Sequence, residues 1–366
     1  MKNKLIFEFS KNKTDGDSSL NNLLGGKGAN LAEMSNMEIP VPPGFTITTE
    51  VCNYFTENKN LPNSLDNEIR QAVSKLENLS DKCFGGVGTP LLLSVRSGGR
   101  VSMPGMMDSI LNIGLNDSNV SQLAEAFNDE RFALDSYRRL IQMYSNVVLG
   151  VEHERFEAVL ANKKRMDNVV SDADFNVDQL NWIINAYKNT VERFTDSLFP
   201  QEPYEQLTGA IEAVFNSWQN KRASTYRKIN NIPDSWGTGA TIQTMVFGNL
   251  NYKSGTGVAF TRNPSNGNKE LYGEYLINAQ GEDVVAGIRT PHPITKHSKV
   301  EQESLESKFP KAYKELLEIS TKLENHFKEA QDIEFTIENE VIYLLQTRTA
   351  KRTAQASVKI AIDMQK

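Results

Sequence analysis

Cysteine is scarce in this chain, and its scarcity argues against two kinds of protein. Only Cys52 and Cys83 are present among the 366 residues, and they have neither a CxxC spacing nor neighbouring histidines. The sequence therefore predicts neither a disulfide framework nor a zinc site. It favours a protein of the reducing cytoplasm.

Long hydrophobic runs and an excess of basic residues are also missing. No stretch approaches the ~20 apolar residues that a membrane helix needs, and the apolar run near the start is too short for a signal peptide. The 40 basic residues are scattered and are outnumbered by 46 acidic ones, which leaves a net charge of -6. We therefore expect no membrane and no nucleic-acid partner, whereas a local phosphate pocket is compatible with this balance.

Histidine is rare too, and its settings give no sign of a catalytic triad. None of the four histidines lies in a glycine-rich segment, and none is paired in sequence with an acid and a nucleophile. We therefore expect binding and electrostatic positioning rather than covalent catalysis. The four are His153, His292, His297 and His326.

What the chain does contain is a pair of alternating segments near its C-terminal end. QDIEFTIE at 331–338 and VIYLLQTR at 341–348 alternate polar and apolar residues with the period of a β-strand. We predict an antiparallel hairpin with a three-residue loop at 339–341. A two-residue loop would slip the register by one and turn one strand's polar side chains to the other face.

The predicted register brings four polar side chains to one face of the hairpin. Glu334 would lie opposite Gln346. Asp332 would lie opposite Arg348. Aligned carboxylates suit Mg²⁺ and a neighbouring guanidinium suits phosphate, so the pattern favours a metal-nucleotide site. A surface hairpin with ordinary cross-strand salt bridges fits the same residues, and the hairpin alone leaves both interpretations open.

Two glycine-rich segments nearer the start also suit phosphate. Lys27 lies in GGKG, where glycines let backbone amides approach phosphate oxygens, although the spacing is not that of a Walker A motif and a plain turn is the alternative. Arg96 follows LLLSV, and we expect it at the C-terminal tip of a strand. The next segment, SGGRVSMPGMMDS, is typical of a loop that wraps a polyphosphate. The alternative is a surface loop with a salt-bridged arginine.

The remaining pattern indicates an α/β (α+β) protein with about two domains, on a prior of ~150 residues each. Apolar residues at helical spacing predict helices at 134–148, 180–194, 207–218 and 310–328, with Phe194 and Leu317 on buried faces. We expect the chain to cross between two lobes near Met245 to Asn249. The expected domains are a first lobe at 1–116 plus 200–248, a helical insertion at 117–199, a second lobe at 249–350, and a helix at 351–366 that leads to a central domain.

Several blocks together resemble the nucleotide-binding part of the pyruvate, phosphate dikinase family. They include LLGGKGANLAEM, LLSVRSGGRVSMPGMMDS, QTMVFGN, SGTGVAFTRNP and QDIEFTIE…LLQTR. The resemblance covers nearly the whole chain, but only the N-terminal part of that multidomain enzyme. It implies an ATP-grasp-like fold in which ATP and Mg²⁺ are held between two lobes.

The resemblance also implies roles for individual residues. Lys27, Arg96 and Arg348 would act on the phosphates as the catalytic residues, while Asp332 and Glu334 would hold the metal. The nucleotide contacts it implies are Lys27, Arg96, Gln243, Met245, Val246, Glu334, Gln346 and Arg348, with Glu282 and Asp283 as weaker candidates near the phosphates.

The family's chemistry requires domains outside these residues. There, a histidine on a swivelling central domain takes the pyrophosphoryl group of ATP, inorganic phosphate accepts the terminal phosphoryl group, and a C-terminal barrel converts pyruvate to phosphoenolpyruvate. We therefore expect a partial reaction, with a homodimer as one arrangement of the full-length enzyme. The alternatives are a non-catalytic nucleotide-binding regulatory module and a phosphoenolpyruvate synthase-type half-enzyme in which water replaces phosphate.

Two residues depart from the family pattern. Glu38 stands where the family commonly has glycine at a helix end, so we expect a strained left-handed residue there, at a cost of about 1 kcal/mol. Gly99 stands where the family usually has alanine, which should loosen the phosphate loop.

Overall fold

The computed structural model describes residues 4–286, 289–296 and 303–365. The chain divides into two compact units. The first comprises Met1–Glu8, Ser19–Gly28 and Pro43–Met245, and the second comprises Phe9–Ser18, Ala29–Pro42 and Val246–Lys366.

The first unit is built on a five-stranded sheet with the order β1-β2-β5-β3-β4. The pairings of β2 with β5, β5 with β3, and β3 with β4 are antiparallel. Every residue of the central strand β5 is buried, because strands lie on both of its edges and helices contact it. The strands are β1 (Ile6–Phe9), β2 (Gly44–Ile47), β3 (Leu93–Gly99), β4 (Ser109–Ile113) and β5 (Thr238–Thr244).

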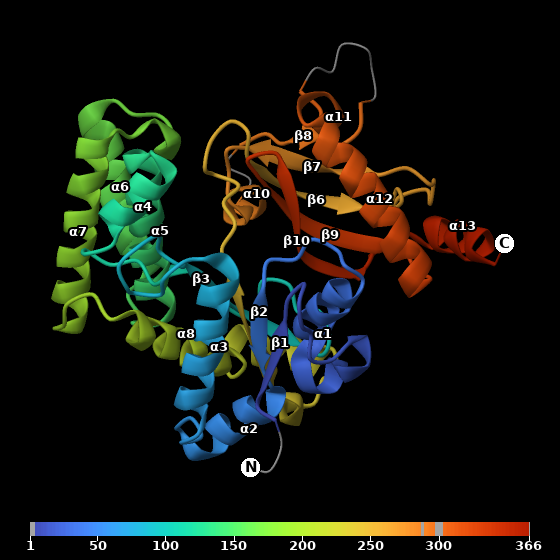
Figure 1. Ribbon diagram of the computed structural model, residues 1–366, viewed down its shortest axis with the longest axis horizontal. Helices are drawn as coiled ribbons and strands as arrows, with labels where there is room; N and C mark the ends of the chain where they lie inside the picture. Colours follow the sequence, from blue (N-terminus) through green and yellow to red (C-terminus); the bar gives the residue numbers. More distant parts are fainter. Residues whose placement is uncertain (1–3, 287–288, 297–302, 366) are drawn as a thin grey trace. The chain divides into compact units, whose positions relative to one another are not determined.

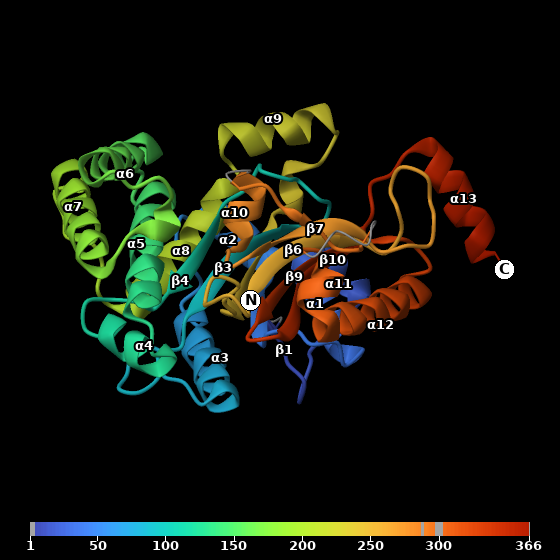
Figure 2. The ribbon, with the colours of Figure 1, turned by 90° about the horizontal axis from the view of Figure 1, so that it is seen from above.

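Helices account for most of the rest of the first unit, and α5, α6 and α7 lie side by side (Figures 1 and 2). The helices predicted at 134–148, 180–194 and 207–218 are confirmed as α5, α7 and α8. Phe194 was wrongly expected in the core: it is 47% exposed, and the Arg155 guanidinium lies 4.9 Å from its ring centre. The helices are α2 (Thr49–Asn58), α3 (Leu65–Ser80), α4 (Val120–Phe127), α5 (Glu130–Val147), α6 (His153–Asp167), α7 (Val177–Thr195), α8 (Pro203–Ser217) and α9 (Lys221–Ile229).

Helix α1 (Asn21–Asn36) is interrupted at Gly25, which has a φ of 68°. A β-carbon at this position would lie 1.7 Å from the carbonyl oxygen of Gly98 in β3. No other residue can be accommodated there, because the left-handed conformation and the contact both exclude a side chain. The GGKG segment is therefore held directly against the end of β3.

The second unit also contains a five-stranded antiparallel sheet, in the order β10-β9-β6-β7-β8. Helix α12 (Pro310–Phe327) covers one face of it (Figure 1), and Leu316 and Leu323 of this helix share a core with Ile333 and Phe335 of β9. The strands are β6 (Gly255–Phe260), β7 (Tyr272–Ile277), β8 (His292–Pro293), β9 (Gln331–Glu338) and β10 (Val341–Thr349), and the other helices are α10 (Gly281–Ala286), α11 (Leu305–Lys308) and α13 (Ala354–Met364).

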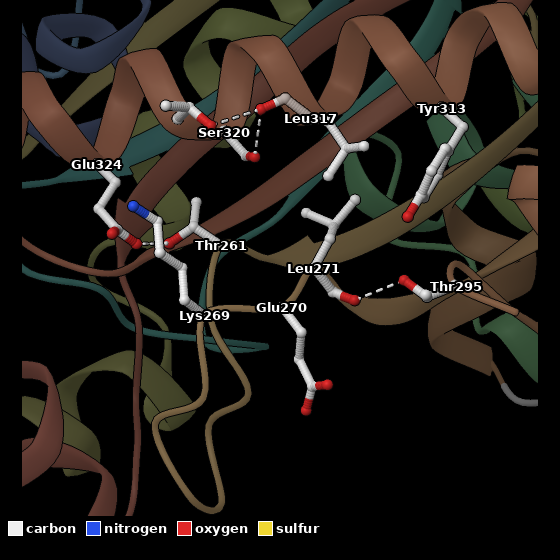
Figure 3. A pocket seen from close by; sticks show the side chains of 10 residues that line it. Thr261, Lys269, Glu270, Leu271, Thr295, Tyr313, Leu317, Ser320 and Glu324 are labelled. Carbon is white, nitrogen blue, oxygen red and sulfur yellow. Dashed lines mark hydrogen bonds between the residues drawn. The ribbon is translucent and has the colours of Figure 1, made fainter. Parts of the chain in front are cut away.

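The structure confirms the helix predicted at 310–328 and corrects one of its faces. Leu317 was expected to be buried with Leu316, but this residue is 36% exposed and lines a cavity beside the helix (Figure 3). Two antiparallel sheets with many helices make the mixed α and β fold that the sequence indicated. Within the described residues, none of the helices has the length and apolar character needed to cross a membrane.

Candidate functional site

The hairpin of β9 and β10 has the predicted cross-strand pairs. Glu334 is paired with Gln346, and Asp332 is paired with Arg348. Because directly paired residues point to the same side of a sheet and alternate residues share a face, all four side chains lie on one face. The neighbouring residue Ile333 faces α12 instead.

The predicted loop, however, is wrong. Val341 pairs with Glu338, so the turn contains only Asn339 and Glu340, and both have positive φ, as a type I′ turn requires. The expected register slip does not occur, because a β-bulge at Leu345 adds one unpaired residue to β10. Because of the bulge, the polar side chains of β10 lie on the same face on which a three-residue loop would have placed them.

Direct contacts join the members of each pair. Arg348 Nε donates to Asp332 Oδ2 at 2.7 Å, and Gln346 Nε2 donates to Glu334 Oε1 at 3.1 Å. Burial raises the pKa of Asp332; Arg348 opposes this rise, and the nearby negative charge of Glu334 adds to it. A further cation close to this carboxyl would therefore stabilise its charged form.

The donor set of this face fits Mg²⁺. Mg²⁺ in proteins typically takes one or two carboxylates and completes its shell with water and phosphate oxygens. Asp332 and Glu334 supply two carboxylates on one strand face. In the part of the chain that the structure describes, no group of three or more His, Cys, Asp or Glu side chains is placed to hold a metal ion.

We had predicted Arg96 at the C-terminal tip of a strand. The structure instead places it within β3. It pairs with Thr241 of β5 and Ser109 of β4, and β3 continues to Gly99, so the first residues of the expected loop are strand residues. The ladder to β5 explains the difference, since pairing with Gly239 and Thr238 of that strand holds even Gly98 and Gly99 extended. The segment that is not in a strand is 100–108.

The same ladder brings Arg96 and Gln243 to one face of the first sheet. Gln243 pairs with Ser94, two residues from Arg96, and paired residues share a face. Gln243 is buried, and the residue is only 1% exposed. Lys27 is close by, because a β-carbon on Gly98 would lie 3.2 Å from the β-carbon of Lys27. The first unit thus gathers two cations and an amide from three distant parts of the sequence.

Arg100 is a neighbour that sequence reasoning did not single out. Its carbonyl oxygen accepts from Asn21 Nδ2 at 3.1 Å, and its guanidinium lies 5.3 Å from the ring centre of Trp236. Its position four residues after Arg96, at the end of the glycine-containing segment RSGGR, was the sequence signal that could have identified it.

The other predicted residues are held by local contacts. Met245 N donates to the Leu92 carbonyl oxygen at 2.9 Å. Met245 is the last residue of the first unit, and Val246 begins the final segment of the second. Glu282 and Asp283 lie in the first turn of α10, and Asp283 Oδ2 accepts from Gln280 N at 2.8 Å, which is a capping contact.

Three of the histidines lie in the described residues. His153 is 3.4 Å from Glu157, His326 is 2.5 Å from Glu33, and the His292 ring centre lies 5.8 Å from that of Tyr275. His297 lies outside the described residues.

Comparison with known proteins points to one family throughout. The family model for "Pyruvate phosphate dikinase, AMP/ATP-binding domain" matches residues 21–84, 58–313 and 294–366. The chain is 53% identical to pyruvate, phosphate dikinase of Rickettsia prowazekii over 100% of its own length and 41% of that protein. It is 51% identical to the enzyme of Clostridium symbiosum over 99% of the chain and 40% of that protein. For the chloroplastic enzyme of Mesembryanthemum crystallinum the identity is 48%, over 99% of the chain and 37% of that protein. The chain therefore spans about two fifths of the length of these relatives.

Proposed function

Because the chain belongs to the pyruvate phosphate dikinase AMP/ATP-binding domain family, we propose that it binds Mg²⁺-ATP and prepares its phosphates for transfer to a histidine on another domain. The observation that carries the proposal is that Asp332 pairs with Arg348, and Glu334 with Gln346, on one face of the β9–β10 hairpin. Phosphoryl transfer needs carboxylates that hold a cation and, beside them, a guanidinium that can bind phosphate.

The residues divide the work by their chemistry. Lys27 and Arg96 offer positive charge to phosphate oxygens, and Arg348 offers a planar fork that is kept oriented by Asp332. Asp332 and Glu334 would hold Mg²⁺, which when bound neutralises charge on the phosphates. None of these side chains forms a covalent intermediate; they bind and orient.

The remaining nucleotide contacts belong to this proposal as well. Gln243, Met245 and Val246 would line the adenine, and Gln346 would orient Glu334. Glu282 and Asp283 are weaker candidates near the phosphates, since Asp283 already accepts a capping hydrogen bond.

We propose an ATP-grasp-like fold for the two sheets, with each unit supplying nucleotide contacts of its own. The domain division would be a first lobe at 1–116 plus 200–248, an insertion at 117–199, a second lobe at 249–350 and a connecting helix at 351–366. The complete reaction, from ATP, pyruvate and phosphate to AMP, phosphoenolpyruvate and pyrophosphate, would need a phosphohistidine domain and a pyruvate-binding barrel. We expect the cytoplasm as the compartment and a homodimer for the full-length enzyme.

Calorimetric titration with Mg²⁺-ATP tests the binding step. Lys27→Met and Glu334→Gln should each weaken binding by about 10-fold or more, because a hydrogen bond to a charged group contributes ~1.5–3 kcal/mol. Lys75→Met is the matched control, since Lys75 pairs with Glu8 at the surface of the first unit and should leave binding unchanged. No binding by the unaltered chain would refute the proposal.

The transfer step is tested by adding a separately produced histidine domain and ATP labelled in the terminal phosphate. Label should remain on the histidine domain without inorganic phosphate and should leave as pyrophosphate when phosphate is added. Binding with no labelled protein would support the regulatory module instead. Release of label that does not depend on phosphate would support a synthase-type half-enzyme.

A further inference from the structure

The proposed function assigns no role to helix α9 (Figure 2), which is firmly held within the first unit. The buried side chain of Arg227 fixes the helix. Its Nε donates to Asp234 Oδ1 at 2.7 Å, and its guanidinium lies 4.3 Å from the ring centre of Trp218. The Trp218 indole in turn donates to the Asp234 carbonyl oxygen at 2.9 Å. Helix α9 is therefore a rigid support for whatever it contacts.

The start of α9 contacts the loop 100–108, which follows β3. Asn220 Nδ2 donates to the Met106 carbonyl oxygen at 3.2 Å. Arg222 Nη2 lies 3.1 Å from Asp108 Oδ1. Two polar contacts thus join the last part of this loop to the first turn of α9.

The other end of the loop lies against the GGKG segment. Asn21 Nδ2 donates to the Arg100 carbonyl oxygen at 3.1 Å, and a β-carbon on Gly26 would lie 3.5 Å from the Gly99 carbonyl oxygen. Lys27 is the next residue after Gly26. The loop therefore begins beside one of the cations assigned to phosphate and ends at α9.

Between its two ends the loop is open. Of residues 101–105, all but Met103 are exposed. Gly105 has a φ of 69°, and a β-carbon there would meet nothing within 4 Å. Because packing fixes so little of the middle, the contacts at the two ends determine where the loop lies.

The amide of Asn220 serves the helix and the loop at once. Its Oδ1 accepts from Ala223 N at 2.7 Å and so caps α9. An amide has its donor on the nitrogen, so the capping contact turns Nδ2 toward the carbonyl oxygen of Met106. The cap of α9 therefore fixes the orientation of the donor that holds the loop.

We propose that Asn220 and Arg222 are positioning residues for nucleotide binding, which hold the loop 100–108 in the place where it closes on the phosphates of ATP. They act through the loop. A loop already in place before the ligand arrives loses less entropy on binding, and the apparent affinity rises with the fraction of chains in which it is in place. The inference rests on the proposed function, since it requires a triphosphate beside Lys27 and Arg96.

Asn220→Ser separates the loop contact from the cap. Serine also caps helices, but its side chain is too short to reach Met106 while it does so. Calorimetric titration of the full chain with Mg²⁺-ATP should show binding weakened by about five-fold, the effect of one ordinary hydrogen bond. Binding of AMP, which lacks the outer phosphates, and stability in urea should change little. An unchanged affinity for Mg²⁺-ATP overturns the proposal.

A charge exchange tests the second contact. Arg222→Asp and Asp108→Arg change the net charge in opposite directions, so a purely electrostatic effect would weaken Mg²⁺-ATP binding in one variant and strengthen it in the other. Positioning predicts weaker binding in both, by about three-fold because the pair is largely exposed, and recovery in the double variant. Lys221→Asp is the matched control, since it makes the same charge change in the same exposed turn of α9 and should have little effect. Opposite effects of the two single variants, or no recovery, overturn the proposal.

Tryptic digestion of the nucleotide-free chain measures the loop directly, because Arg100 is the one tryptic site within 100–108. Cleavage after Arg100, followed by mass spectrometry, should be about three-fold faster in Asn220→Ser than in the unaltered chain. Equal rates would contradict the inference. This readout needs no nucleotide, so it separates the two proposals: an unaltered chain that binds no Mg²⁺-ATP refutes the proposed function, whereas unchanged binding and cleavage in Asn220→Ser refute the positioning role alone.

Discussion

The sharpest test of the hairpin is the removal of Arg348. Arg348→Ala deletes the guanidinium that donates to Asp332 Oδ2 at 2.7 Å, and it leaves a carboxylate whose side chain is only 10% exposed. The pKa of Asp332, already raised by burial, should rise further because Arg348 opposes that rise.

The expected cost lies between two known limits. Breaking a fully buried ion pair costs ~3–5 kcal/mol, and an exposed pair contributes ~0–1 kcal/mol. Since the Arg348 side chain is 36% exposed and its partner 10%, we expect a loss of about 2 kcal/mol in the free energy of unfolding. Asp332→Asn, which also removes the charge, should cost about 1 kcal/mol. The double variant should cost less than the sum by about 1 kcal/mol, because both changes remove the same contact.

Urea unfolding of the two single variants and the double variant measures these free energies. Arg70→Ala is the matched control, since Arg70 and Asp66 are 2.9 Å apart but 50% and 59% exposed. Its cost should not exceed about 1 kcal/mol, the contact of Arg70 with the Tyr204 ring at 4.2 Å included. An Arg348→Ala cost no larger than that of Arg70→Ala would refute the reasoning.

The pH dependence gives a second check with a definite sign. A carboxyl whose pKa is raised on folding binds its proton more tightly in the folded state. The contribution of Asp332 to stability therefore falls as pH rises from its ordinary value of 3.8 through the raised pKa. Arg348→Ala should extend this fall to higher pH, and an unchanged profile would contradict the assignment.

Three other changes have definite expected outcomes. Glu38→Gly should stabilise the chain by about 1 kcal/mol in urea unfolding, because Glu38 has a φ of 58°; a loss of stability would contradict this. Asp135→Asn should lower the free energy of unfolding by ~3–5 kcal/mol. Burial opposes ionisation of Asp135, but Arg138 and Arg139 hold its pKa well below its usual range. The contribution of Asp135 to stability is therefore complete at neutral pH and is lost as pH falls below 3.8. Acid titration followed by circular dichroism should show that loss in the unaltered chain and a flatter profile in the variant. Burial raises the pKa of Cys52 to about 11, so a thiol reagent at pH ~8 should modify only Cys83 before unfolding; rapid reaction at both thiols would count against the buried position of Cys52.

The hairpin shows how far sequence reasoning can go. Alternation specified the face of each side chain, and the pairs Asp332 with Arg348 and Glu334 with Gln346 were predicted correctly. The turn was not, because Asn339 and Glu340 lack the Asn-Gly signature of a type I′ turn. The bulge at Leu345 has no sequence signal of its own, since an extra residue is accommodated only when the partner strand is present.

Arg96 and Leu317 illustrate the opposite limit. Glycines after Arg96 suggested a loop, but the ladder with β5 extends the strand to Gly99. Leu317 has the helical spacing of a core residue, yet the residues around it leave a cavity beside its side chain. Both errors come from neighbours that are distant in sequence and that local pattern does not include.

The sequence by itself determined the kinds of residue that could serve a nucleotide and the alternation that places Asp332 and Glu334 on one strand face, and its resemblance to a family added the expectation of a left-handed residue at Glu38. These depend on local geometry, which repeats every two residues in a strand or follows from one backbone torsion. Only the tertiary structure decided that a bulge aligns Arg348 with Asp332, that Lys27 lies against the strand of Arg96, and that a cavity lies beside α12. Each of these depends on contacts between distant segments, whose register and packing are selected by the complete fold.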